Sequence, residues 1–234
     1  FLPGMFPASI MTSAAAVVTP KAYIFNGTDE YLKRTLSTSS PGTTKFTYSL
    51  WVNLDAFTGS SIDPTPQGAP FFQVVNTPTV TSFLAFDLTG SGDQIGVAQD
   101  SGSADWQEVA GSLVPDIAVS TWSHIVLRYD STDATAENRI QFYRNGTLVT
   151  DADLGAGKPS LNEVHALFTN GREHQIGAEA DITFFLDGKL AFIEVLDGVA
   201  VDANSFAFDN GGVWTRKPYT GSYGTYGFRL DGIN

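Results

Sequence analysis

Hydrophobic and polar residues alternate along much of the chain, with the period of two that is typical of β-strands. The clearest pair of strands lies between Trp122 and Thr150, where two alternating arms flank a polar loop at 130–138. Asn145-Gly146 follows the second arm and predicts a tight type I′ reversal, because both central residues of that turn need positive φ. The stretch therefore predicts two consecutive β-hairpins.

Two further stretches fix the expected core. Residues 45–53 alternate strictly, and the apolar face consists of Phe46, Tyr48, Leu50 and Val52. Residues 189–196 form the most apolar run in the chain, which predicts a central strand covered on both faces. Shorter strands are expected at 22–25, 71–75, 82–88, 94–97, 106–109, 164–168, 174–177 and 183–186.

Only one helix signal is present, at 202–208. Asp202 is a suitable N-cap, and Gly211-Gly212 can end the helix after two turns at most. About a dozen short strands with one short helix imply two packed antiparallel sheets. We therefore expect an all-β jelly-roll sandwich.

Composition narrows the function classes. The 234 residues carry a formal net charge of −12, which argues against a nucleic-acid partner because such binding depends on Lys and Arg. The sequence has no cysteine, so disulfides and thiolate metal sites are excluded. A hydrophobic content of 42% is ample for the core of one large domain.

The two ends of the chain differ from its middle. Residues 1–21 are apolar but lack a basic region and contain Pro3 and Pro7, so we interpret them as an extended N-terminal arm rather than a signal peptide. The sandwich is expected at 22–212, and 213–234 form a C-terminal tail rich in aromatic residues and Gly. No run approaches the roughly 20 apolar residues that span a bilayer, so membrane insertion is not expected.

Five blocks of sequence resemble, in the same order, those of concanavalin A-like, laminin-G-like jelly rolls. They lie at 25–32, 46–52, 122–129, 140–146 and 187–195. The resemblance implies that fold for the region from Ala22 to Asn210.

The segment from Pro218 to Asp231 resembles an ending that follows such domains in structural proteins of tailed bacteriophages. This resemblance implies a virion component, such as a tail fibre, head fibre or capsid decoration protein, and we expect it to be non-enzymatic. The implied partners are other virion proteins, further copies of the chain and, in host attachment, cell-surface glycans.

Catalytic patterns are missing from the sequence. Glucanases of this superfamily use two carboxylates on one strand, but no Glu-x-Asp-x-x-Glu pattern occurs. The nearest acidic residues fall in turn-rich sequence: Glu163, Glu173, Glu179 and Asp181. The histidines, His124, His165 and His174, are isolated, and we expect His124 to be packed or hydrogen-bonded. A glycoside hydrolase or lyase with an unrecognised site is the enzymatic alternative.

Laminin-G-like modules often hold one Ca²⁺ at the rim of the sandwich through oxygen ligands. The candidates here are Asp87, Asp93 and Asp100, whose alternative role is the local hydrogen bonding of turns. No other cofactor is expected.

Aromatic residues supply the remaining candidates. Trp106, Tyr129 and Tyr143 could stack on a sugar, with cross-strand packing as the alternative. Aromatic and apolar residues at the two ends are expected to contact neighbouring subunits, with packing on the chain's own sandwich as the alternative. These interface candidates are Phe1, Leu2, Phe6, Trp214, Tyr219, Tyr223, Tyr226 and Phe228.

Overall fold

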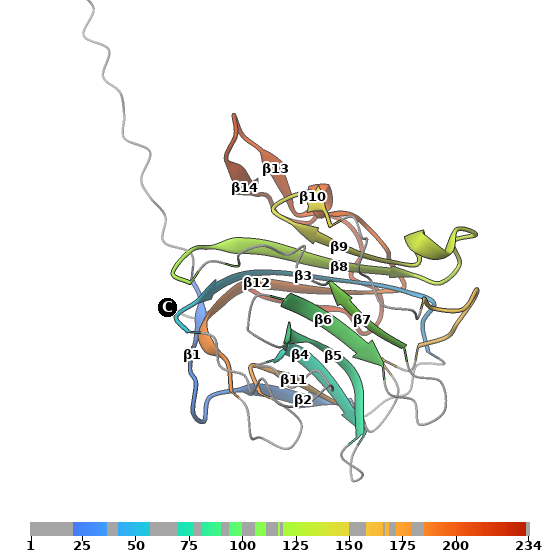
Figure 1. The fold of residues 1–234 in the computed structure, drawn as a ribbon, viewed down its shortest axis with the longest axis horizontal. Coiled ribbons are helices and arrows are strands. Elements are labelled where there is room, and N and C mark those ends of the chain that lie inside the picture. Colours follow the sequence, from blue (N-terminus) through green and yellow to red (C-terminus); the bar gives the residue numbers. More distant parts are fainter. Residues whose placement is uncertain are drawn as a thin grey trace, which may run out of the picture.

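The structure is a computed structural model that describes residues 21–36, 42–56, 70–76, 81–89, 94–99, 106–110, 117, 119–149, 158–165, 167–168, 172–178 and 185–232. Figure 1 shows two sheets stacked face to face, with a hairpin standing out from one of them. Within the described ranges, no helix has the length and apolar character needed to cross a membrane.

Seven strands form the first sheet, sheet A. They are β1 (Tyr23–Asn26), β3 (Lys45–Leu54), β8 (Ser123–Asp130), β9 (Ile140–Arg144), β10 (Thr147–Leu148), β12 (Asp187–Asp197) and β15 (Phe228–Leu230). The order is β1-β12-β3-β8-β9-β10, and β15 also pairs with β12. β1 pairs with residues 187–190 and β15 with residues 193–195, so the two short strands follow one another along the same side of β12.

Six strands form the second sheet, sheet B. They are β2 (Leu32–Thr35), β4 (Pro70–Asn76), β5 (Thr81–Thr89), β6 (Gln94–Gln99), β7 (Trp106–Ala110) and β11 (Arg172–Ile176). The order is β2-β11-β4-β5-β6-β7, and every pairing in both sheets is antiparallel. The predicted two-sheet antiparallel sandwich is confirmed.

The core lies between the sheets. The predicted apolar face of β3 is confirmed, since Phe46, Tyr48, Leu50 and Val52 are all buried. Tyr48 packs against Phe72 of β4 across the sandwich, with ring centroids 4.2 Å apart. β12 is buried on both faces, as the apolar run at 189–196 predicts.

The predicted reversal at Asn145-Gly146 is also confirmed. Asn145 has φ 44° and Gly146 has φ 81°, which are the positive values that a type I′ turn requires. β8, β9 and β10 therefore form the two consecutive hairpins expected from the sequence.

The helix predicted at 202–208 is wrong. Only one 3-10 turn forms, η2 (Ala203–Ser205), and the Asp202 side chain makes no capping hydrogen bond. The chain then enters β13 (Ala207–Asp209), which pairs with β14 (Trp214–Arg216). The backbone N–H of Gly212 donates to Asp209 Oδ1 at 2.6 Å, so Gly212 belongs to the hairpin turn rather than to a helix end.

Tyr129 offers a direct test of the core. Its ring is fully buried and stacks on Phe46 with centroids 4.6 Å apart, and its hydroxyl donates to the Glu163 carbonyl at 3.3 Å. We expect Tyr129→Ala to lower the free energy of unfolding by about 3–5 kcal/mol, because it leaves a cavity in the core. Tyr129→Phe keeps the stack and should cost about 1 kcal/mol. Urea unfolding measures both, and equal losses would contradict the packing role of the ring.

Candidate functional site

The C-terminal part of the chain covers the outer face of sheet A. A second cluster of buried apolar residues forms there, from Val126, Leu196, Ala203 and Phe206. Half-buried side chains pack around it: Tyr143, Val199, Val201, Trp214, Tyr219 and Tyr223. Polar residues of β3 on this face are buried as well, and Thr47 Oγ1 donates to the Val199 carbonyl while accepting from the Val201 N–H. The face of β3 that looks polar in the sequence is therefore an internal surface.

His124 lies at the centre of this covered face. Trp214 Nε1 donates to His124 Nδ1 at 2.9 Å, and Ser49 Oγ lies 2.9 Å from His124 Nε2. Because an indole N–H can only donate, Nδ1 must be the acceptor, and a neutral ring carries its proton on Nε2. Burial lowers the pKa of His124 to about 3. The imidazole therefore donates to Ser49 and does not activate its hydroxyl as a base would.

Glu194 is the buried carboxylate of the same face, 1% exposed. The Tyr223 hydroxyl donates to Glu194 Oε2 at 2.8 Å, and Arg216 Nη2 lies 3.7 Å from Oε1. Burial raises the pKa of this carboxyl, and the hydrogen bond from Tyr223 and the guanidinium groups of Arg229 and Arg216 oppose that effect. Arg216 in turn lies over the ring of Phe192, 3.8 Å from its centroid. These contacts hold the C-terminal segment to β12.

The hairpin formed by β13 and β14 projects from the face just described (Figure 1). Trp214 packs inward against the Asn145-Gly146 turn, since a side chain at Gly146 would collide with its ring. Phe208 and Val213 instead remain exposed, by 42% and 64%. These two side chains are therefore candidates for a contact with another protein.

The structure places the predicted interface residues in two groups. Trp214, Tyr219 and Tyr223 pack on the outer face of sheet A, while Tyr226 and Phe228 pack against the main core. All five rings are therefore covered in part by the chain's own sandwich, and a contact with another subunit stays a prediction for them. Phe1, Leu2 and Phe6 lie outside the described residues.

The predicted boundary between 22–212 and 213–234 falls in the turn between β13 and β14. β15, beyond that boundary, is hydrogen-bonded to β12. Residues 213–232 thus pack as part of the sandwich.

The three glycan candidates do not come together. Tyr129 is fully buried, so its assignment as a sugar-stacking residue is wrong; the ring is held by Phe46 between the sheets. Tyr143 is half-buried at the edge of the outer-face cluster, and its hydroxyl donates to Gln141 Oε1 at 3.1 Å. Trp106 begins β7, and its side chain lies outside the described part of the structure.

The calcium candidates stay predictions. Asp87 lies on β5 with an undescribed side chain, and Asp93 and Asp100 lie outside the described residues. Among the residues that are described, no group of three or more His, Asp or Glu side chains is placed to hold a metal ion. Of the acidic residues, Glu179 and Asp181 also lie outside the described ranges, and Glu173 forms an ion pair with Lys33 at 3.6 Å.

Sequence reasoning missed Glu194 and Arg216. Glu194 is a lone acidic residue in the apolar run at 189–196, and a charge in such a run is the signal of a buried group that needs a partner. No periodicity connects it to Arg216, because the partner comes from a different hairpin.

A family model described as the concanavalin A-like lectin/glucanases superfamily matches residues 26–204. The match ends before β13, so the projecting hairpin and β15 lie beyond it. No curated protein matches the chain.

Several solved structures are similar at low sequence identity. The heptameric SAP-like pentraxin of Limulus polyphemus is 15% identical, with a TM-score of 0.53 over 91% of this chain and 93% of that one. Domains LG4-5 of the mouse laminin α1 chain are 12% identical, with a TM-score of 0.47 over 93% and 49%. Tailspike protein 2 of bacteriophage CBA120, in its enzymatically active domain, is 11% identical, with a TM-score of 0.48 over 80% and 28%. The likeness to the pentraxin shows the fold.

The buried histidines predict acid sensitivity. Burial lowers the pKa of His124 to about 3 and that of His174 to about 4, whereas an unfolded histidine titrates near 6.5. Between pH 6.5 and 4 the unfolded chain binds more protons, so stability falls as pH falls. Each histidine should contribute a loss of about 2 kcal/mol between pH 7 and pH 5.

Comparing the unaltered chain with the His124→Gln variant isolates the contribution of His124 to this loss of stability. Glutamine can accept from Trp214 and donate to Ser49 without titrating. Between pH 7 and pH 5 the free energy of unfolding should fall by about 2 kcal/mol less in this variant than in the unaltered chain, as measured by urea unfolding. The carboxylates contribute equally to both proteins, so an unchanged difference would contradict a neutral buried His124.

Proposed function

The chain belongs to the concanavalin A-like lectin/glucanases superfamily, and from this premise we propose that it is a non-enzymatic structural protein of a bacteriophage virion. In this role it is a fibre, decoration or minor capsid component that displays its sandwich on the particle. The resemblance of Pro218 to Asp231 to the ends of phage structural proteins supports the proposal.

The observation that carries the assembly role is the projecting hairpin. Its inner side is fixed to the sandwich by Trp214, while Phe208 and Val213 face outward. A short, anchored hairpin with two apolar side chains provides a preorganised contact, because little conformational entropy is lost when a partner covers it. The partner is another virion protein or a second copy of the chain.

The proposal of a non-enzymatic role rests on the acidic residues. A retaining or inverting glycosidase needs two carboxyl groups facing one cleft. Glu194, a buried acidic residue whose pKa is raised by burial, is covered by Tyr223 and paired with Arg216. Its role is to hold the C-terminal segment.

We expect Phe208→Ser with Val213→Ser to reduce incorporation into particles by at least about tenfold, since both apolar contacts are lost. Exposed positions tolerate such changes, so the unfolding free energy should stay within about 0.5 kcal/mol of the unaltered chain. Quantitative mass spectrometry of purified particles measures incorporation. The matched control is Leu161→Ser with Val164→Ser, which alters side chains exposed by 54% and 58% elsewhere on the surface. Equal incorporation of both double variants would refute the hairpin contact.

Host attachment through glycans is the display function that the family suggests. We expect the chain to bind a subset of a glycan array and Trp106→Ala to remove that binding, because a sugar ring gains stacking energy from an indole. Trp122→Ala, at a half-buried indole before β8, is the control and should leave binding intact. A blank array would count against glycan attachment, and release of reducing ends from polysaccharides would instead establish a hydrolase.

A further inference from the structure

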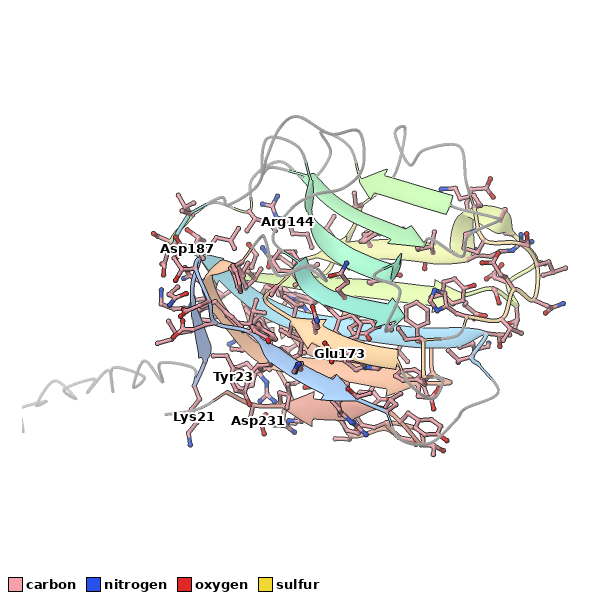
Figure 2. The ribbon with its side chains drawn as sticks, turned by 90° about the horizontal axis from the view of Figure 1, so that it is seen from below. Lys21, Tyr23, Arg144, Glu173, Asp187 and Asp231 are labelled. Atoms are coloured by element: carbon pink, nitrogen blue, oxygen red, sulfur yellow. The ribbon has the colours of Figure 1, made fainter. Side chains whose placement is uncertain are left out.

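A cavity of about 310 Å³ lies between the two sheets at the edge where β1 and β15 of sheet A face β2 and β11 of sheet B. Figure 2 shows this edge, with Tyr23 labelled on β1, Glu173 on β11 and Asp231 just past β15. The cavity is separate from the projecting hairpin and from the buried outer face of sheet A. Its volume is at the lower end of the range of small-molecule sites.

Strand register gives the cavity one apolar end. On sheet B, Leu32 and Ile176 are opposite each other across β2 and β11. On sheet A, Tyr23 of β1 and Leu230 of β15 line the cavity. β1 pairs with the first half of β12, and β15 pairs with its middle. These side chains carry no charge, so this end suits hydrocarbon.

The next pair on the same face of these two strands, two residues further along each, forms a polar end. Arg34 is opposite His174, and both lie near Phe228: the Arg34 guanidinium is 5.9 Å from the centroid of that ring, and the two ring centroids of His174 and Phe228 are 6.5 Å apart. Neighbouring residues in register have Cβ atoms about 5 Å apart, so the two polar groups are close together.

His174 is 3% exposed, and it lines the cavity. Its Nε2 lies 2.9 Å from the Leu167 carbonyl, which can only accept, so the ring proton is on Nε2 and Nδ1 is an acceptor. Among the described residues, Nδ1 has no hydrogen-bond partner. An unsatisfied buried acceptor is costly, and a ligand hydroxyl would satisfy it.

Arg34 and Lys33 are the two cationic residues that line the cavity, and Arg34 is the one opposite His174. Within the described part of the chain no carboxylate pairs with it, whereas its neighbour Lys33 pairs with Glu173 at 3.6 Å. In a chain with a net charge of −12, an exposed guanidinium without a carboxylate is free to bind an external anion. Arginine is well suited to this because its fork of N–H groups fits a carboxylate.

We propose that this cavity binds a small amphiphilic carboxylate. The carboxylate lies on Arg34, a hydroxyl close to it donates to His174 Nδ1, and the hydrocarbon part extends along Leu32 and Ile176. At about 30 Å³ for each water-sized group, the volume holds about ten such groups, close to the eleven or so non-hydrogen atoms of 3-hydroxyoctanoate.

Isothermal titration calorimetry of the full chain with three probes tests the proposal. 3-Hydroxyoctanoate should bind about fivefold more tightly than octanoate, because its hydroxyl satisfies the buried acceptor. Arg34→Gln should weaken both acids by about tenfold or more but leave 1-octanol unaffected, since only the acids use the guanidinium. Leu32→Trp should fill the apolar end and abolish binding of all three.

Lys189→Gln is the matched loss of one cation, at a surface pair with Asp55 that is not part of the cavity lining, and should leave each affinity unchanged. Absence of saturable binding by the acids, or acid affinities unaltered in Arg34→Gln or Leu32→Trp, would overturn the proposal. Equal affinities for the two acids would overturn the role of His174. Because the assay uses the isolated chain, it succeeds or fails independently of virion assembly.

Discussion

The structure depends on the burial of polar groups beneath the C-terminal segment. On the outer face of sheet A, Thr47, His124 and Glu194 are almost completely removed from solvent. A buried polar group without a partner costs several kcal/mol at worst, so each must be satisfied. Each has a partner in the C-terminal segment: the backbone at 199–201 for Thr47, Trp214 for His124 and Tyr223 for Glu194. The C-terminal segment and sheet A therefore stabilise each other.

The sequence predicts strands and turns well because these follow from local chemistry. Alternation in residues 45–53 identifies which side chains share a face of β3, and the Asn145-Gly146 turn follows from the need for positive φ. Alternation does not indicate whether the polar face of a strand is exposed to solvent. Ser49 looks like a solvent-facing residue, yet it is buried under a segment more than 150 residues away.

The candidate site residues show the same limit of prediction from sequence. Tyrosine is a residue type that can stack on a sugar, but the position of Tyr129 opposite Phe46 places it in the core. The helix predicted at 202–208 fails for a related reason, since pairing of β13 with β14 outweighs a weak capping signal. The aromatic rings around His174 belong to Phe72 of β4, Phe228 of β15 and Phe168 of a turn, and no spacing in the sequence brings these residues together.

The edge of β12 connects these features. β1 and β15 share one side of this strand, and between their pairing regions a bulge places Phe192 at φ 49°, a value that a bulky residue rarely adopts. The bulge turns the Phe192 ring under Arg216, which also faces Glu194, so the strained residue is part of the contact that holds the C-terminal segment. Phe228 and Leu230 of that segment form one wall of the cavity between the sheets. A ligand that binds the folded wall adds its binding free energy to the pairing of β15 with β12. One wall of the cavity and the projecting hairpin thus belong to the same C-terminal segment.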